Sequence, residues 1–126
     1  MSIESTVKPT ESELEILQIL WEKGKCTVRD VHEILTRSKE AGYTTTLKLM
    51  QIMHEKGLVA RDTSSKTHIY NALASQQKTR QQLVSRLIDN AFNGSAASMV
   101  MQALGNHQSS KDEIEAIKKY LDELDQ

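Results

Sequence analysis

The chain has 126 residues, of which 38% are hydrophobic and 26% are charged, as is typical of a globular protein with one ordinary domain or two small ones. Its single cysteine, Cys26, excludes an internal disulfide framework and a multi-cysteine metal site. No apolar run approaches the length of a membrane helix and no signal-peptide pattern is present, so we expect a cytoplasmic protein.

The net charge of −1 hides an uneven distribution along the chain. Residues 25–74 contain eight basic and five acidic residues, whereas both flanking segments are negative. Proteins that bind phosphates need a local positive surface more than a high overall charge. The central segment is therefore the place to look for an anionic partner.

Two helices are predicted at the start of the chain. Thr10 and Glu13 have the spacing of a capping box, and the helix that they open ends at Gly24. Thr27 and Asp30 open a second, shorter helix in the same way. Residues 37–42 are predicted to form a polar loop.

A third helix and a hairpin follow. The helix is predicted from Tyr43 to Lys56 and ends at Gly57, a residue type common just after a helix. Residues 58–63 and 67–73 are rich in β-branched and aromatic types and flank a turn at residues 64–66, as in a β-hairpin. Three helices followed by a two-stranded ribbon is the order of a winged helix-turn-helix.

The last third of the chain is predicted to be helical. Helices are expected over residues 76–92 and 95–104, with Gly105 ending the second, and Ser110 and Glu113 open another with a third capping box. The fold class is thus mainly α with a small β-hairpin: a winged helix-turn-helix DNA-binding domain over residues 8–74, then a three-helix dimerisation domain over 75–126. Alone, these last helices have too small a core, so we expect them to pack against a second copy. The alternative is that they fold back onto the first domain.

The third helix carries side chains suited to DNA. If Thr46, Leu49, Met50 and Met53 are buried, five others point away from the core: Thr44, Thr45, Leu47, Lys48 and Gln51. Gln can pair with an adenine edge, Thr and Leu contact a thymine methyl, and Lys reaches guanine or phosphate. An ordinary solvated face explains the same residues.

More than one interpretation also stays open for neighbouring side chains. Tyr43 either packs against the core or hydrogen-bonds a phosphate. Arg61 and Lys66 lie on the ribbon, where Lys66 either contacts the sugar–phosphate backbone or is only solvated.

No catalytic constellation is present in the sequence, so we expect no enzyme, cofactor, metal or small-molecule ligand. The four histidines are scattered without carboxylate or cysteine partners at ligand spacing, and structural or solvated roles are expected for His32, His54, His68 and His107. Cys26 is interpreted as a small structural residue rather than a reactive thiol.

Three separated segments resemble the penicillinase-repressor family (BlaI/MecI type). They are PTESELEILQILWEKG, YTTTLKLMQIMHEKGLV and FNGSAASMVMQAL followed by SSKDEIEAIKKYLDE, in the family's order and spacing. The resemblance implies a winged-helix domain, a helical dimerisation domain, and repression through a dyad operator with TACA/TGTA half-sites. The implied partners are double-stranded operator DNA and a second copy of the chain.

Carried over position by position, the resemblance implies three groups of residues. The DNA-binding group is Tyr43, Thr44, Thr45, Leu47, Lys48, Gln51, Arg61 and Lys66. The dimerisation group is Leu83, Leu87, Ile88, Val100, Leu104, Ile117 and Leu121. In antibiotic-sensing members a membrane-bound sensor protease triggers cleavage of an Asn-Phe bond, and the aligned pair here is Gln102 and Ala103. This departure weakens the case for cleavage and for a role in antibiotic resistance.

A different class of function remains open beside the repressor. A winged helix that binds a protein, without DNA readout, would need an exposed apolar patch on the third helix, and Leu47 and Ile52 give it some support.

Overall fold

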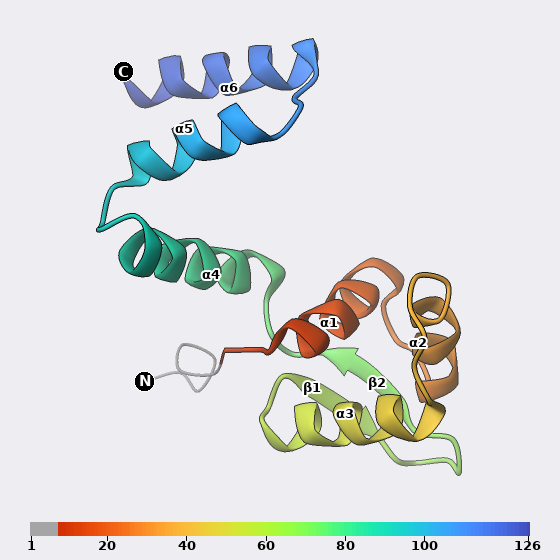
Figure 1. Ribbon diagram of the computed structural model, residues 1–126. Helices are drawn as coiled ribbons and strands as arrows, with labels where there is room; N and C mark the ends of the chain where they lie inside the picture. Colours follow the sequence, from red (N-terminus) through yellow and green to blue (C-terminus); the bar gives the residue numbers. More distant parts are fainter. Residues whose placement is uncertain (1–7) are drawn as a thin grey trace. The chain divides into compact units, whose positions relative to one another are not determined.

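The computed structural model describes residues 8–126, and the first residues considered above for a signal peptide lie outside this range. The first part of the chain forms α1 (Glu11–Lys23), α2 (Val28–Leu35), α3 (Tyr43–Glu55), β1 (Val59–Asp62) and β2 (Ile69–Ala72). It is followed by α4 (Gln76–Ala91), α5 (Ala96–Asn106) and α6 (Lys111–Leu124), as Figure 1 shows. The fold class, mainly α with a small β-hairpin, is confirmed.

The chain divides into two compact units, one ending at Leu83 and the other beginning at Val84. This division falls within α4, whose first turns belong to the first unit and contain the buried Thr79. The functional boundary between residues 74 and 75 stays a prediction. Within the described residues, no helix is both long and apolar enough to cross a membrane.

Three helices begin as their sequences predict. The hydroxyl of Thr10 accepts a hydrogen bond from the amide of Glu13 (3.2 Å), and the Glu13 carboxylate accepts one from the amide of Thr10 (2.9 Å). The same reciprocal pair forms at Thr27 with Asp30 and at Ser110 with Glu113. These boxes satisfy amides that the first turn of a helix leaves unpaired, so local sequence alone fixes where α1, α2 and α6 start.

The core of the first unit is aliphatic and sulfur-rich. One face each of α1, α2 and α3 meets the hairpin around buried side chains that include Leu17, Val31, Met50 and Tyr70. The Trp21 indole Nε1 donates to the carbonyl of Ala74 (2.9 Å), which ties α1 to the chain just after β2. The helices are therefore held against the hairpin by apolar contacts and by this partly buried hydrogen bond.

The hairpin pairs β1 with β2 antiparallel, with Arg61 opposite Tyr70. A further bridge, which the sequence analysis did not anticipate, joins Cys26 to Tyr70: each amide donates to the other residue's carbonyl (2.9 and 2.7 Å). Burial, with the nearby Asp30 charge, raises the pKa of the Cys26 thiol. Cys26 thus anchors the hairpin through its backbone and keeps a protonated, buried thiol.

Three glycines were expected to end helices, and two of them do: Gly24 after α1 and Gly57 after α3. Gly57 follows α3 with φ +81°, a left-handed conformation that residues with a Cβ rarely adopt. Gly105 lies inside α5, which continues to Asn106, so the predicted end of that helix was wrong. Without a left-handed turn at position 105, glycine weakens the helix but does not break it.

A nearly buried ion pair joins the start of α1 to the end of α3. Lys56 Nζ lies 2.6 Å from a carboxylate oxygen of Glu13, whose side chain is 3% exposed. Burial raises the pKa of Glu13, but the hydrogen bond and charge of Lys56 and the bonds from Thr10 outweigh it, leaving the pKa below its usual 4.5. The carboxylate is therefore ionised at neutral pH, and the stability that it contributes is lost only as the pH falls below about 4.5.

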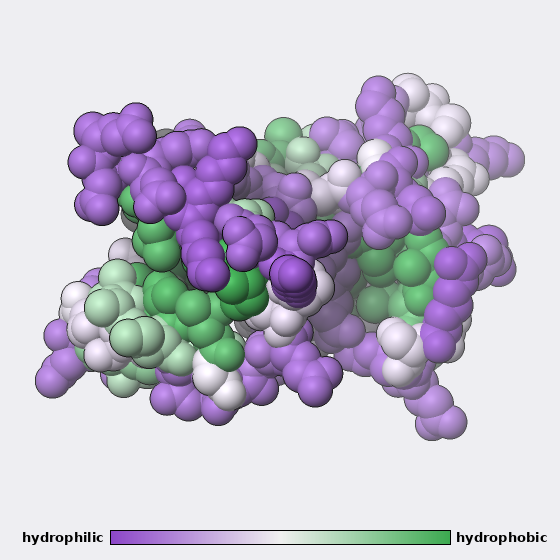
Figure 2. Space-filling view, turned by 90° about the horizontal axis from the view of Figure 1, so that it is seen from above, coloured by the Kyte–Doolittle hydropathy of each residue, from purple (hydrophilic) through white to green (hydrophobic). Residues whose placement is uncertain are grey.

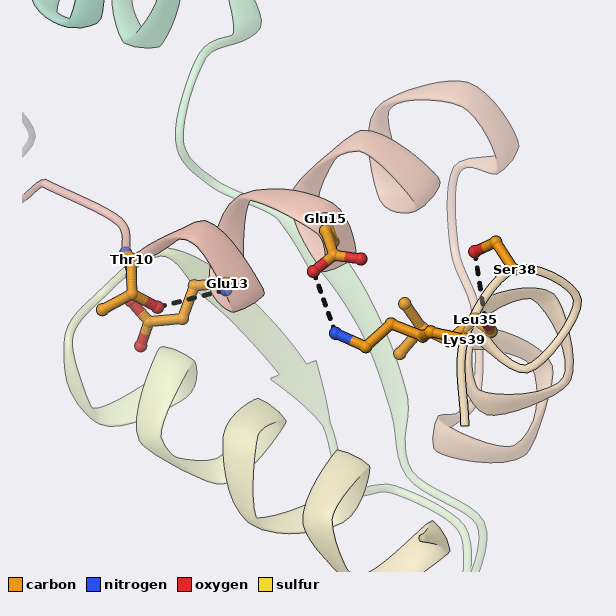
Figure 3. Close-up of polar contacts among 6 residues, drawn as sticks. All are labelled: Thr10, Glu13, Glu15, Leu35, Ser38 and Lys39. Atoms are coloured by element: carbon orange, nitrogen blue, oxygen red, sulfur yellow. Dashed lines mark hydrogen bonds and ion pairs between the residues drawn. The ribbon is translucent and has the colours of Figure 1, made fainter. Parts of the chain in front are cut away.

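A second, exposed ion pair links the loop after α2 to α1. Lys39 Nζ lies 3.0 Å from Glu15 Oε1, and both side chains are 41% exposed (Figure 3). Such pairs contribute little, because water screens them and ordering two long side chains costs entropy.

The two lysines provide a matched test of burial. Lys56→Met leaves the Glu13 carboxylate buried without its cation, and we expect the free energy of unfolding to fall by about 3 kcal/mol. Lys39→Met removes an equivalent charge from an exposed pair and should cost less than about 0.5 kcal/mol. Urea unfolding measures both, and equal losses would contradict a special role for the buried pair.

Candidate nucleic-acid interface

The helix α3 presents one buried side and one solvent side. Thr46, Met50 and Met53 are almost completely buried, while Thr44, Thr45 and Lys48 are exposed. Gly42 caps the helix without a side-chain hydrogen bond, and the first turn contains no acidic residue. Amides and the helix dipole at this end favour a nearby anion.

The predicted DNA-binding residues of α3 occupy two different surfaces. Tyr43, Leu47 and Gln51 line a groove of about 550 Å³ between α3, the start of α2 and the hairpin. Thr44, Thr45 and Lys48 lie outside this groove, around a shallow depression of about 250 Å³ that Leu49 and Ile52 complete. We call the first surface the wing groove and the second the outer face.

Leu47 differs from its expected orientation. It was predicted to point away from the core, but it is half-buried and packs against the core cluster. Its place on the hairpin side of α3 explains the difference, since a spacing argument for one helix takes no account of a neighbouring ribbon. The predicted role of Leu47 in DNA binding stays untested.

The turn of the hairpin is shaped by its own polar side chains. The Asp62 carboxylate accepts a hydrogen bond from the amide of Ser64 (2.9 Å), and this bond lowers the pKa of Asp62. The hydroxyl of Ser65 donates to the carbonyl of Thr67 (2.9 Å). These local bonds hold Lys66, which is exposed, at the rim of the wing groove.

The wing groove also contains residues that sequence reasoning missed. Arg29 from α2 and His68 from the hairpin line it together with the predicted Arg61 and Lys66. The groove lining includes no acidic side chain. Arg29 had been counted only as a charge, because nothing in the spacing of α2 shows that its first turn meets α3.

A compact cluster joins α2 to the first turn of α3. The rings of His32 and Tyr43 meet edge to face, with centroids 5.4 Å apart and planes at 86°. The guanidinium carbon of Arg29 lies 5.6 Å from the Tyr43 centroid, within range of a cation–π contact. His32 Nδ1 and the Thr46 hydroxyl form a 2.9 Å hydrogen bond. Tyr43, 41% exposed, therefore packs on α2 rather than in the core.

The described residues contain no group of three or more His, Cys, Asp or Glu side chains able to hold a metal ion. Of the four histidines, His32 takes the structural position just described and His68 lines the wing groove. The charged side chains that line the wing groove are Arg29, Arg61 and Lys66, and all three are basic, which suits binding to an anion.

The predicted dimerisation residues lie on α4, α5 and α6. Leu87, Val100, Leu104 and Leu121 are exposed, and the other three are half-buried: Leu83, Ile88 and Ile117. Gln102 and Ala103 are both exposed inside α5.

Three helices and an anchored hairpin, with polar and cationic side chains on the third helix, define a protein of the winged helix-turn-helix class. The family described as penicillinase repressor matches residues 9–123, nearly the whole chain. The protein therefore belongs to the penicillinase-repressor family, which confirms the resemblance stated from its sequence.

Two relatives in sequence agree with this membership. The methicillin resistance regulatory protein MecI of Staphylococcus aureus (strain N315) is 22% identical over 116 residues, covering 92% of this chain and 94% of MecI. The transcriptional regulator BlaI of Mycobacterium tuberculosis (strain ATCC 25618 / H37Rv) is 29% identical over 117 residues, covering 90% and 82%. A solved structure of a Lactococcus lactis ZitR mutant aligns with a TM-score of 0.47 at 21% identity, covering 98% of this chain and 78% of that one.

Two threonines of α3 test the link between α2 and α3. Thr46→Val removes the hydroxyl that pairs with His32, and we expect the free energy of unfolding to fall by about 1 kcal/mol. The same change at the exposed Thr44 should alter it by less than about 0.5 kcal/mol. Thermal or urea unfolding distinguishes the two, and an unchanged Thr46→Val variant would show that the bond to His32 adds no net stability.

Proposed function

We propose that this protein is a sequence-specific transcriptional repressor that binds a dyad DNA operator as a homodimer. The observation that carries the proposal is the surface of α3: exposed Thr44, Thr45 and Lys48 beside a groove whose only charged side chains are basic. Membership of a repressor family supports the same conclusion.

The outer face of α3 suits contact with base edges. Threonine hydroxyls and methyls contact bases in the major groove, and a lysine ammonium pairs with guanine acceptors or a phosphate. The uncapped first turn of α3 favours a phosphate close to these residues. Lys66, at the exposed turn of the hairpin, reaches the sugar–phosphate backbone and so contributes affinity without sequence preference.

The helices of the second unit supply the argument for a dimer. Neither α5 nor α6 contains a buried residue. Of the ten large hydrophobic side chains exposed in the described chain, eight lie on α4, α5 and α6: Val84, Leu87, Val100, Met101, Leu104, Tyr120, Leu121 and Leu124. Apolar side chains reach the surface among polar ones in Figure 2. So much exposed apolar surface favours burial against a second copy.

A dimer also explains how short recognition helices gain specificity. Two copies related by a two-fold axis place two α3 helices on half-sites about 34–36 Å apart, or a multiple of this spacing. The dyad operator with TACA/TGTA half-sites, implied by the resemblance, has this symmetry. We infer that the repressor acts in the cytoplasm, without a cofactor.

The signal that releases the operator is a separate proposal. A membrane-bound sensor protease acting at Gln102 and Ala103 would cut α5 and divide the dimerisation helices. Both residues are exposed, but they lie inside a helix, so the bond would have to unwind locally before a protease could bind it in extended form.

A protein-binding role is the second candidate, and one feature of the outer face favours it. Leu49 and Ile52 are half-buried and line the mostly apolar depression beside Thr44 and Thr45. A partner helix could cover it. DNA binding with a steep dependence on salt distinguishes the repressor from this alternative.

The direct test is fluorescence anisotropy with a labelled TACA/TGTA dyad duplex and a scrambled duplex, at several salt concentrations. We expect the dyad to bind about 10³-fold more tightly, with a salt slope of several phosphates. Equally weak binding to both duplexes, followed by failure to select any sequence from random DNA, would contradict the proposal.

Two alanine substitutions distinguish contacts with DNA bases from contacts with the sugar–phosphate backbone. Thr45→Ala should cost about 1–3 kcal/mol of binding free energy on the dyad and almost nothing on the scrambled duplex. Lys66→Ala should weaken both duplexes alike and reduce the salt slope by about one. If both variants lose affinity equally on the two duplexes, the outer face does not contact bases.

The dimer is tested by placing one charge at two positions on α4. Leu87→Asp buries an unpaired carboxylate in the proposed apolar interface, which should shift sedimentation from dimer to monomer. Ser85, exposed and about 200° around the helix, gives the control: Ser85→Asp should leave the dimer intact. An unchanged Leu87→Asp dimer would place the interface elsewhere.

A further inference from the structure

The aromatic ring of Tyr43 is held by two side chains of α2. His32 meets it edge to face at 5.4 Å, and the guanidinium carbon of Arg29 lies over the ring, 5.6 Å from its centroid. This cation–π contact favours a position of the Arg29 guanidinium beside the first turn of α3.

Arg29 is placed at one wall of the wing groove, and the hairpin supplies two more cations. Arg29, Arg61 and Lys66 all line the groove, and no acidic residue does. These three positive charges are complementary to an anion that runs along the groove.

The shape of duplex DNA indicates which anion this is. A single sugar–phosphate strand separates each major groove from the adjacent minor groove. A protein with α3 in the major groove and its hairpin beyond that groove must therefore straddle one strand. The wing groove lies between these two elements. We propose that it holds one sugar–phosphate strand of the operator and that Arg29, which lies over the Tyr43 ring, binds a phosphate of that strand.

This proposal rests on the proposed DNA-binding function and assigns Arg29 a role that its position in the sequence does not reveal. It also assigns different roles to the residues on the two surfaces of α3. Thr45 and Lys48, on the outer face, are left to contact bases, whereas Gln51, in the groove, lies beside the backbone. Phosphate contacts fix orientation and register but carry no sequence information, so Arg29 contributes to all duplexes equally.

The experiment compares Arg29→Ala with the wild type in the anisotropy assay, on the dyad and scrambled duplexes, over a series of salt concentrations. We expect affinity to fall about tenfold on both duplexes, and the salt slope to decrease by about one. Arg37→Ala is the matched control, because Arg37 is exposed at the end of α2 and does not line the wing groove. Its salt slope should match that of the wild type.

The cation–π contact between Arg29 and Tyr43 is tested by a double-mutant cycle. Tyr43→Phe keeps the ring, so Arg29→Ala should weaken binding as much in this background as in the wild type. Tyr43→Leu removes the ring, and the loss on adding Arg29→Ala should shrink several-fold. Circular dichroism and the dimer's sedimentation confirm that each variant is folded.

The outcomes separate the two proposals. Wild-type protein that fails to bind either duplex with salt dependence would overturn the proposed function. Wild-type binding with an Arg29→Ala variant of unchanged salt slope, or with a loss confined to the dyad, would overturn only the phosphate contact of Arg29. An equal loss on Arg29→Ala in all three Tyr43 backgrounds would overturn the role of the Tyr43 ring in placing Arg29.

Discussion

Burial of one side of α3 is the constraint on which the rest of the molecule depends. Thr46, Met50 and Met53 are almost fully buried against α1, α2 and the hairpin. Burying a methionine side chain contributes roughly 1.5–3 kcal/mol, so rotating the helix about its axis would lose several kilocalories per mole. Packing of the core therefore determines which side of α3 is exposed, and Thr44, Thr45 and Lys48 lie on that side. The Glu13–Lys56 pair and the His32–Thr46 bond hold the same helix at its two ends.

Local sequence predicted where the elements begin, because capping chemistry acts within four residues. Thr10, Thr27 and Ser110 each start a helix with the expected reciprocal bonds. Contacts made by packing could not be predicted in this way. The bridge from Cys26 to Tyr70 spans 44 positions and uses only backbone groups, so side-chain identity gives no sign of it. Gly105 was expected to stop a helix, but a glycine does so only when the chain turns left-handed there.

The candidate site likewise has a part that local sequence predicted and a part that depends on packing. The residue types on α3 indicated a DNA-binding helix, and helical spacing correctly separated Thr46 and Met50 from the exposed Thr45 and Lys48. Spacing could not show that the hairpin covers one edge of this helix and divides the predicted residues between the wing groove and the outer face. Arg29 was missed for the same reason. The last three helices show the opposite case, since Leu87, Val100, Leu104 and Leu121 were named from sequence as dimerisation residues and are exposed in the single chain.

The central claim is that α3 and the hairpin together form the DNA-binding surface. The most direct measurement is a titration of isotope-labelled protein with the dyad duplex, followed through its backbone amide resonances. The account predicts that the largest shifts occur at residues 43–51, at Arg29 and around the hairpin turn at Lys66, and that the amides of α6 change little. Shifts concentrated on α5 and α6, with α3 unaffected, would contradict it.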